Sequence, residues 1–190
     1  MTEAERPAIH NVLRMTDAET LIRAAPDSPE RPGGIIALDQ VESPIVRAGV
    51  GYWRRLSGER GFPTRSNISP GDIRGLLRNT VLMRVVDAGA DFDYRIVGDA
   101  HVAAYGFSMQ GKLLSEMEEF APGHGSVLKG LYGRVVRKRE PFALRGWLER
   151  GERQKQYIYS ESVFLPLGPD QSAVDHVLNF SVYIPRDMKA

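Results

Sequence analysis

Cysteine is absent from this 190-residue chain. Its absence excludes disulfide bonds, thiolate metal ligands, a cysteine nucleophile and any chromophore attached through cysteine. An excess of charge is absent too, because 25 basic and 24 acidic residues give a formal net charge of +1. A nearly neutral chain has no global electrostatic attraction to nucleic acid or to an anionic membrane.

Long apolar runs are also missing. The first residues, MTEAERPAIHNVLRMTDAETLIRAA, carry a charge every few positions and leave no room for the apolar core of a signal peptide. No window approaches the roughly 18 apolar residues that a membrane-spanning helix needs. We therefore predict a cytoplasmic protein without membrane association. The composition that remains, 42% hydrophobic and 26% charged, is ordinary for one globular domain.

Changes of composition divide the chain into three parts. Residues 1–34 are predicted to be an N-terminal arm and linker. Within them, residues 2–23 loosely fit an amphipathic helix, and AAPDSPERPGG is rich in proline, glycine and small residues. The compact domain is predicted over residues 35–184, and a short C-terminal tail over residues 185–190.

Two helices are predicted before the first strand. Residues 39–56 show a rough apolar face that includes Trp53, which we expect to be buried against the sheet or a partner helix. A second, short helix is predicted over residues 70–77. Its start, Ser69-Pro70-Gly71-Asp72, combines a serine N-cap, a proline in the first helical position and an acid in the first turn.

The pattern then changes to that of an antiparallel sheet. Residues 80–86 and 92–97 predict a β-hairpin, and Gly98 is expected to permit a sharp turn into a helix capped by Asp99. A capping box at Ser115-Glu116-Met117-Glu118 predicts a further helix. The strongest helical pattern covers residues 126–138, and three strands are predicted at residues 142–148, 156–167 and 174–184. This order predicts an α+β fold with one five-stranded antiparallel sheet, helices on one face and an N-terminal helical extension.

A series of short motifs in this order resembles a known family. The motifs are Phe62-Pro63-Thr64-Arg65, Ile68-Ser69-Pro70-Gly71-Asp72-Ile73, Tyr94-Arg95-Ile96-Val97-Gly98, Tyr105-Gly106, Gly111-Lys112-Leu113-Leu114, Pro141-Phe142 and Leu165-Pro166-Leu167. Over residues 40–183 the chain resembles the stand-alone PAS-like proteins of alphaproteobacteria, the PAS_5 family. The resemblance implies a sensor or interaction module and not an enzyme. It also implies a ligand site between sheet and helices, and pairing through a helix before the first strand.

Residues that could carry catalysis or hold a metal do not form a recognisable pattern. His124 stands between glycines just before the long helix, which disfavours it as a haem ligand, and no metal-binding histidine spacing occurs. The segment around Ser108 has one residue too many for a nucleophile elbow. Asp175 and His176 are adjacent on a predicted strand and are expected to point to opposite faces. We therefore predict no catalytic residue and no metal site.

Charge is unevenly distributed along the chain. Acids predominate in residues 87–119 and bases in residues 134–155, where aromatic residues are sparse. Solvated helix ends and strand edges are the favoured interpretation. A surface for an acidic partner or for nucleic acid is the less favoured alternative, and the sparse aromatic residues disfavour stacking on single-stranded nucleic acid.

A candidate pocket can be assembled from five residues, Tyr94, Tyr105, Leu131, Trp147 and Asn179. Aromatic residues on sheet faces more often belong to the core than to a ligand site. Asn179 would be a polar group inside the pocket only if its side of the last strand faces the helices. The alternation of the strand does not decide which side that is.

The first hypothesis is a regulatory homodimer that pairs through the helix around Asp39–Leu56 and signals to a protein partner that the sequence does not identify. A small apolar or aromatic ligand would lie between the sheet and the helix at Ser126–Lys138, and no cofactor can be named. The second hypothesis is a scaffold or adaptor dimer without a ligand. A small-molecule enzyme is a third, disfavoured class because no acids or histidines converge.

Overall fold

The structure is a computed structural model that describes residues 33–121, 123–150 and 156–185. The side chains of residues 60, 147–150, 156–158 and 185 are not among those described. The predicted helix at residues 2–23, nearly all of the linker and the tail at residues 186–190 lie outside the described residues.

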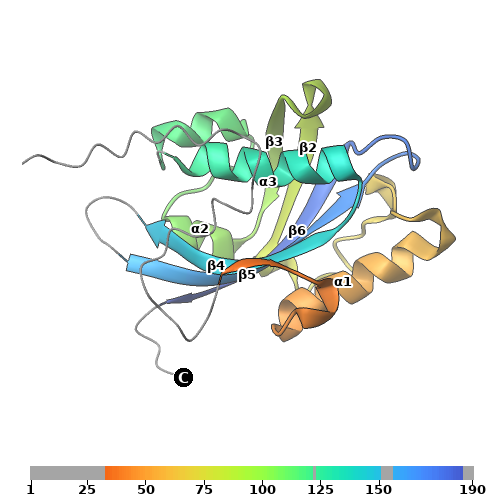
Figure 1. Ribbon diagram of the computed structural model, residues 1–190, viewed down its shortest axis with the longest axis horizontal. Coiled ribbons are helices and arrows are strands. Elements are labelled where there is room, and N and C mark those ends of the chain that lie inside the picture. Colours follow the sequence, from red (N-terminus) through yellow and green to blue (C-terminus); the bar gives the residue numbers. More distant parts are fainter. Residues whose placement is uncertain (1–32, 122, 151–155, 186–190) are drawn as a thin grey trace, which may run out of the picture.

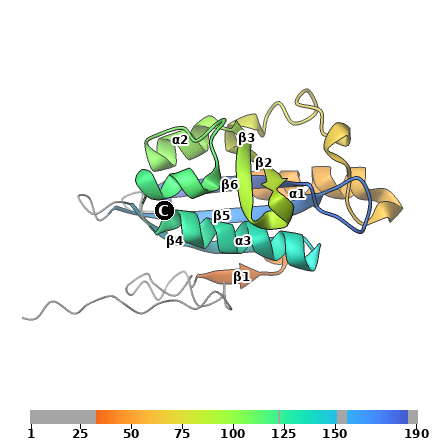
Figure 2. The same ribbon diagram turned by 90° about the horizontal axis from the view of Figure 1, so that it is seen from above.

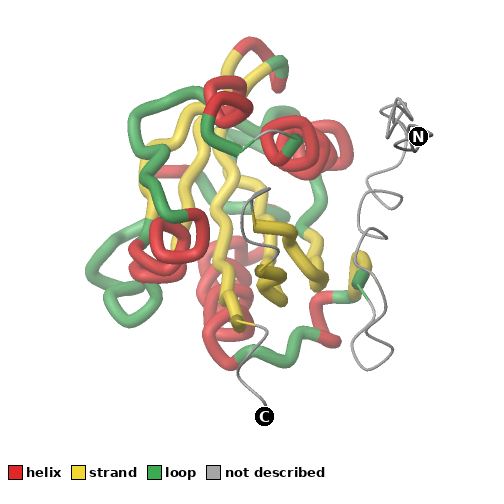
Figure 3. Tube along the Cα trace, turned by 90° about the vertical axis from the view of Figure 1, so that its left-hand side faces the viewer, coloured by secondary structure: helices red, strands yellow, loops and turns green. Residues whose placement is uncertain are grey.

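One antiparallel sheet runs through the described part of the chain in the order β1-β4-β5-β6-β2-β3. Its strands are β1 (Gly34–Ile36), β2 (Thr80–Val86), β3 (Asp91–Val97), β4 (Phe142–Arg150), β5 (Gln156–Leu167) and β6 (His176–Pro185). Figure 3 shows the strands as a curled layer with helices packed around it.

The sheet has six strands, so the prediction of five was wrong. The additional strand is β1, which pairs with β4 at the edge of the sheet opposite β3 (Figure 2). Three residues are too few to show an alternating pattern, and β1 begins inside a glycine-rich stretch that reads as a linker. The five predicted strands are confirmed, with shifts of their ends.

Three α-helices are described: α1 (Pro44–Ser57), α2 (Asp99–Tyr105) and α3 (His124–Lys138). Helix α1 starts later than the prediction because Ser43 is its N-cap, with the Ser43 hydroxyl accepting a hydrogen bond from the Val46 N–H at 3.4 Å. Short 3₁₀ helices complete the elements, at Leu38–Gln40, Gly58–Arg60, Arg65–Asn67, Leu77–Asn79, Asp87–Gly89 and Leu114–Glu119.

Two predicted helix starts were wrong. Residues 70–76 form successive turns that lead into the 3₁₀ helix Leu77–Asn79, and two glycines in the segment disfavour a continuous helix. Ser115 does not cap a helix either. The Glu116 carboxylate instead accepts a hydrogen bond from the Leu113 N–H at 2.6 Å, at the start of a 3₁₀ helix.

Helices cover both faces of the sheet, so the prediction of helices on one face was wrong. Neighbouring residues of β6 show the division, because Asn179 faces the cavity beneath α3 and Phe180 packs against α1. Figure 1 shows α3 and α1 on different sides of the strands. The burial predicted for Trp53 is confirmed, because only 5% of it is exposed and its Nε1 donates to the Pro166 carbonyl at 2.9 Å.

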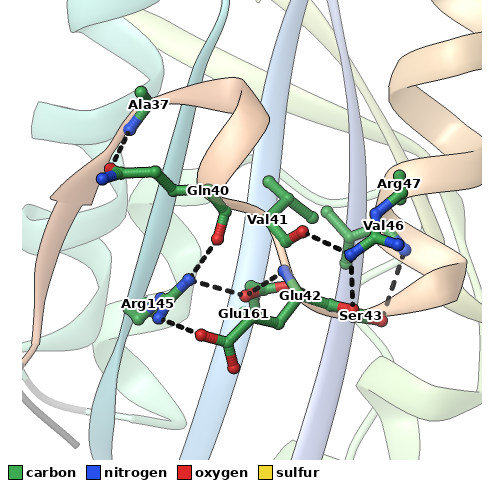
Figure 4. A network of polar contacts seen from close by, with 9 residues as sticks. All are labelled: Ala37, Gln40, Val41, Glu42, Ser43, Val46, Arg47, Arg145 and Glu161. Carbon is green, nitrogen blue, oxygen red and sulfur yellow. Dashed lines mark hydrogen bonds and ion pairs between the residues drawn. The ribbon is translucent and has the colours of Figure 1, made fainter.

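A buried carboxylate fixes the start of α1 to the sheet (Figure 4). Glu161 on β5 is 4% exposed, and it accepts hydrogen bonds from the Ser43 N–H at 2.7 Å and the Glu42 N–H at 3.1 Å. Arg145 on β4 lies beside it, 3.4 Å from Glu161 and 2.8 Å from the Glu42 carboxylate, and also donates to the Gln40 carbonyl. A negative charge near a helix N-terminus is favourable, so Glu161 anchors the start of α1, while Ser43 remains its N-cap.

Gly98 is required by close packing and not by its backbone angles. Its φ of −74° suits any residue, contrary to the expected role in a special turn. A Cβ atom at this position would lie 2.3 Å from the Arg78 carbonyl oxygen and 2.4 Å from that of Leu77. The end of β3 can therefore lie against residues 77–78 only without a side chain.

Candidate ligand cavity

A cavity of about 60 Å³ lies between the sheet and the helices α2 and α3. That is several times the roughly 10–15 Å³ that one water molecule requires. Six of the lining residues are aromatic: Tyr94, Tyr105, Phe107, Tyr132, Phe164 and Tyr183. The polar residues of its lining are His101, Ser160, Ser162, Asn179 and Ser181.

The structure brings four of the five candidate pocket residues to this cavity. Tyr94, Tyr105, Leu131 and Asn179 all line it, from β3, α2, α3 and β6. Asn179 is therefore on the helix-facing side of its strand. The fifth candidate, Trp147, belongs to β4, and its side chain lies outside the described residues.

The sheet forms a polar floor whose groups satisfy one another. The Asn179 Nδ2 donates to the Val163 carbonyl at 2.9 Å, and the Asn179 Oδ1 accepts from the Ser181 hydroxyl at 2.8 Å. The Ser181 and Ser162 hydroxyls are 2.7 Å apart, and the Ser160 hydroxyl is 3.4 Å from the Gly146 carbonyl. Polar side chains in this layer are thus held in place by one another and by the backbone.

His101 is a buried part of the wall that the sequence did not single out. It is 6% exposed, with Nε2 at 3.3 Å from the Asn79 carbonyl and Nδ1 at 2.7 Å from the Tyr183 hydroxyl. Burial lowers the pKa of His101 to about 4, so the ring is neutral at pH 7. The contacts fit one tautomer, in which Nε2–H donates to Asn79 and Nδ1 accepts from Tyr183. The residues that bury and bond His101 are 22 and 82 positions away, so no local signal could have found it.

Four tyrosines converge on the cavity: Tyr94, Tyr105, Tyr132 and Tyr183. Burial raises the pKa of all four phenols, that of Tyr105 to about 12, and the neighbouring phenols raise the pKa of Tyr94, Tyr132 and Tyr183 further. Tyr94 donates to the Met117 sulfur at 3.5 Å, and Tyr183 is bonded to His101. Among the described residues, the hydroxyls of Tyr105 and Tyr132 have no hydrogen-bond partner.

Ser108 and His176, the residues considered as catalytic candidates, form hydrogen bonds with residues close to them in the sequence. The Ser108 hydroxyl accepts from the Gln110 N–H of its own loop at 3.3 Å. His176 and Asp175 do contact each other, with Nδ1 and Oδ1 2.9 Å apart, so the expectation that they point apart was wrong. Asp175 precedes the first residue of β6, and strand alternation does not apply there. Within the described ranges, no three potential metal ligands cluster.

These features define a class of protein, an α+β domain whose curled antiparallel sheet and helices enclose a cavity. A family model, PAS_5, described as a PAS domain, matches residues 41–180. The chain therefore belongs to the PAS_5 family, and a PAS domain indicates a sensory or regulatory module. No curated protein and no solved structure shows a significant match. None of the helices described here has the length and apolar character to cross a membrane.

Proposed function

We propose that the protein is a cytoplasmic sensory module that binds a small ligand in the cavity and signals by protein contact. The cavity itself supports a ligand site, because it has room for several water molecules and two hydroxyls in its lining, those of Tyr105 and Tyr132, have no hydrogen-bond partner among the described residues. Within the described residues the lining contains no Lys, Arg, Asp or Glu, which supports binding and not acid–base chemistry. We assign no catalytic residue.

Strand β5 contacts both the cavity and the start of α1 on the opposite face of the sheet. Ser160 and Ser162 line the cavity, while Glu161 between them points to the other face and anchors the start of α1. A ligand that favours one position of β5 would therefore also favour one position of α1. Such a ligand shifts the equilibrium by the difference between its affinities for the two arrangements.

The second candidate is a ligand-free adaptor dimer. The apolar face of α1 is occupied by its own sheet, so a homodimer through residues 39–56 would use the exposed side of this helix. That side carries Arg47, Arg54 and Arg55, which would meet like charges across a two-fold axis. An acidic partner protein suits this surface better than a second copy.

The mass of the purified protein tests the proposal. We expect native mass spectrometry to show a retained noncovalent species that is lost on denaturation. Leu131→Trp should abolish retention because it fills the cavity from α3, whereas Arg137→Trp adds the same side chain at an exposed position of that helix and should preserve retention. Thermal melting of both variants checks that they fold. Absence of any retained mass in the parent protein would favour the adaptor.

A further inference from the structure

Helix α1 turns one stripe of residues away from the sheet, on the outside of the molecule (Figure 1). The members of this stripe follow one another at helical spacing, so they share one face. All are exposed except Gly51, which is half-buried: Pro44, Arg47, Ala48, Gly51, Arg54 and Arg55. This arginine stripe contains no acid and no large apolar side chain.

Positive charge accumulates on α1 and on the segment that follows it. Residues 44–79 contain seven arginines and only two acids, Glu59 and Asp72, a net charge of +5 in a chain whose net charge is +1. The segment stays close to the helix, because the Ser69 N–H donates to the Tyr52 hydroxyl at 3.1 Å. An acidic molecule is therefore attracted to this part of the surface, although the chain as a whole is nearly neutral.

The charges of the arginine stripe are not neutralised within the described part of the chain. None of its ion pairs includes an arginine of the stripe. Arg47 donates to the carbonyls of Val41 and Glu42 at 2.9 and 3.2 Å, and the Arg55 guanidinium lies 5.8 Å from the centroid of the Tyr52 ring. These contacts position the two guanidinium groups and leave their charge available to a carboxylate.

The middle of the stripe permits close approach of another helix. A Cβ atom at Gly51 would have no neighbour nearer than the Arg55 Nη1 at 3.9 Å, and Ala48 lies one turn earlier. Small facing residues allow helix axes to pack about 8 Å apart. Arg47 precedes these small residues and Arg54 follows them, about 10 Å further along the axis. Side chains seven residues apart on a second helix have the same separation.

Other anionic partners fit this surface less well. The three aromatic residues of residues 44–79, Tyr52, Trp53 and Phe62, are buried, so the bases of a single strand find no exposed ring to stack on. None of the exposed large apolar side chains of the described residues lies in this segment, so it has nothing to insert into an anionic membrane. A second copy would place arginines against arginines across a two-fold axis.

We propose that the arginine stripe docks an acidic α-helix of a partner protein, with carboxylates seven residues apart and small residues between them. This inference rests on the proposed function, because it names the chemistry of the partner that receives the signal. Since Glu161 ties the start of α1 to β5, the partner would contact the helix that is anchored to a strand of the cavity.

A labelled acidic helix tests this surface. The probe is a fluorescein-labelled, alanine-based peptide with glutamates at spacings of three, four and seven residues along one face, and its control carries glutamine at the same positions. Fluorescence anisotropy of the full-length protein with each peptide gives the dissociation constants. In about 50 mM salt we expect the glutamate peptide to bind at least about tenfold more tightly than the glutamine peptide, because several exposed ion pairs together contribute about that much.

Matched charge variants locate the site. Arg54→Gln combined with Arg55→Gln should weaken binding of the glutamate peptide about threefold to tenfold. Arg137→Gln combined with Lys138→Gln removes two charges from the last turn of α3, just as the first pair does from the last turn of α1. This control should change the dissociation constant less than about twofold.

Matched glycine variants test the close approach. Gly51→Leu should weaken binding at least about fivefold, because its side chain keeps the second helix away from α1. Gly130→Leu makes the same change at a position of α3 where a Cβ atom has no neighbour within 4 Å, and it should leave binding unaltered. Thermal melting checks that both variants fold. Each should melt no lower than the parent protein, because leucine is a better helix former than glycine.

Four results would overturn the inference: no binding of the glutamate peptide at about 1 mM, equal binding of the two peptides, equal effects of the two charge variants, or equal effects of the two glycine variants. Tighter binding of a DNA oligonucleotide of the same charge, or of phosphatidylserine vesicles, would overturn it in favour of nucleic acid or a membrane. Self-association that is lost on replacing Arg54 and Arg55 would favour a second copy. None of these results decides whether the cavity holds a ligand, because retention of a native mass and its loss in Leu131→Trp report on that separately.

Discussion

A methyl group added to α1 at Gly49 should destabilise the protein, whereas the same addition at Gly51 should not. Gly49 lies where the helix crosses β6, and its Cβ would come within 2.3, 2.6 and 2.8 Å of three ring carbons of Phe180. At Gly51 the nearest atom is the Arg55 Nη1 at 3.9 Å, which is an ordinary contact.

The magnitude follows from two opposing effects. Replacing glycine by alanine inside a helix stabilises it by about 0.5–1 kcal/mol. Overpacking a close-packed core usually costs about 1–3 kcal/mol, and Phe180 is fully buried, with 0% exposed, so its ring has no open space to enter. We expect Gly49→Ala to lower the free energy of unfolding by about 2 kcal/mol and Gly51→Ala to raise it by about 0.5 kcal/mol.

Urea unfolding followed by circular dichroism measures both changes. A double variant, Gly49→Ala with Phe180→Leu, should lose less stability than the sum of its two single variants, because the smaller side chain removes the clash. Equal stability of Gly49→Ala and Gly51→Ala would refute the docking of α1 on its own sheet. If size-exclusion chromatography then showed a smaller oligomer for Gly49→Ala alone, α1 would pack against a partner helix instead.

Substitutions at three other positions test the remaining contacts. Burial gives His101 a pKa of about 4 against about 6.5 in the unfolded chain. Because the unfolded chain therefore binds a proton more readily, the free energy of unfolding should be about 3 kcal/mol higher above pH 6.5 than below pH 4, and it should fall as the pH drops between these values. His101→Gln should flatten that part of the stability profile in urea titrations, and an unchanged slope would contradict the assignment. Glu161→Ala should cost about 3–5 kcal/mol because it leaves Arg145 and two backbone N–H groups short of an acceptor, and a loss below 1 kcal/mol in the same assay would contradict the network. Trp53→Ala should cost about 3–5 kcal/mol. Trp53→Phe should cost only about 1–2 kcal/mol, because a phenyl ring still fills much of the space of the indole and the main loss is the bond to Pro166. Melting temperatures in the reverse order would be incompatible with this burial.

The elements that were predicted well are those with a long, regular pattern. The stripe of α3 repeats over several turns, and the hairpin joins the β-rich run of β2 to the alternating residues of β3. Strand β1 was missed because three residues carry no period, and the turns at residues 70–76 were read as a helix because a good helix start was given more weight than the glycines after it.

The site residues that were predicted correctly are those that strand or helix periodicity places on one face. The residues that were missed have hydrogen-bond partners in distant parts of the chain. Tyr94 and Leu131 follow from strand and helix periodicity, and both reach the cavity. Tyr183 and His101 come together only because the end of β6 lies beside α2, which depends on the register of the whole sheet. Local patterns contain no such information.

The anchoring of α1 has a consequence for the order of folding. Its N-cap region bonds to Glu161, 118 and 119 residues later in the chain, and Trp53 bonds to Pro166, 113 residues later. Helix α1 can form early on the ribosome, but it cannot reach its place until β5 and β6 have been synthesised and paired. Loops of this length slow the search for native contacts, so docking of this helix should be among the late steps of folding.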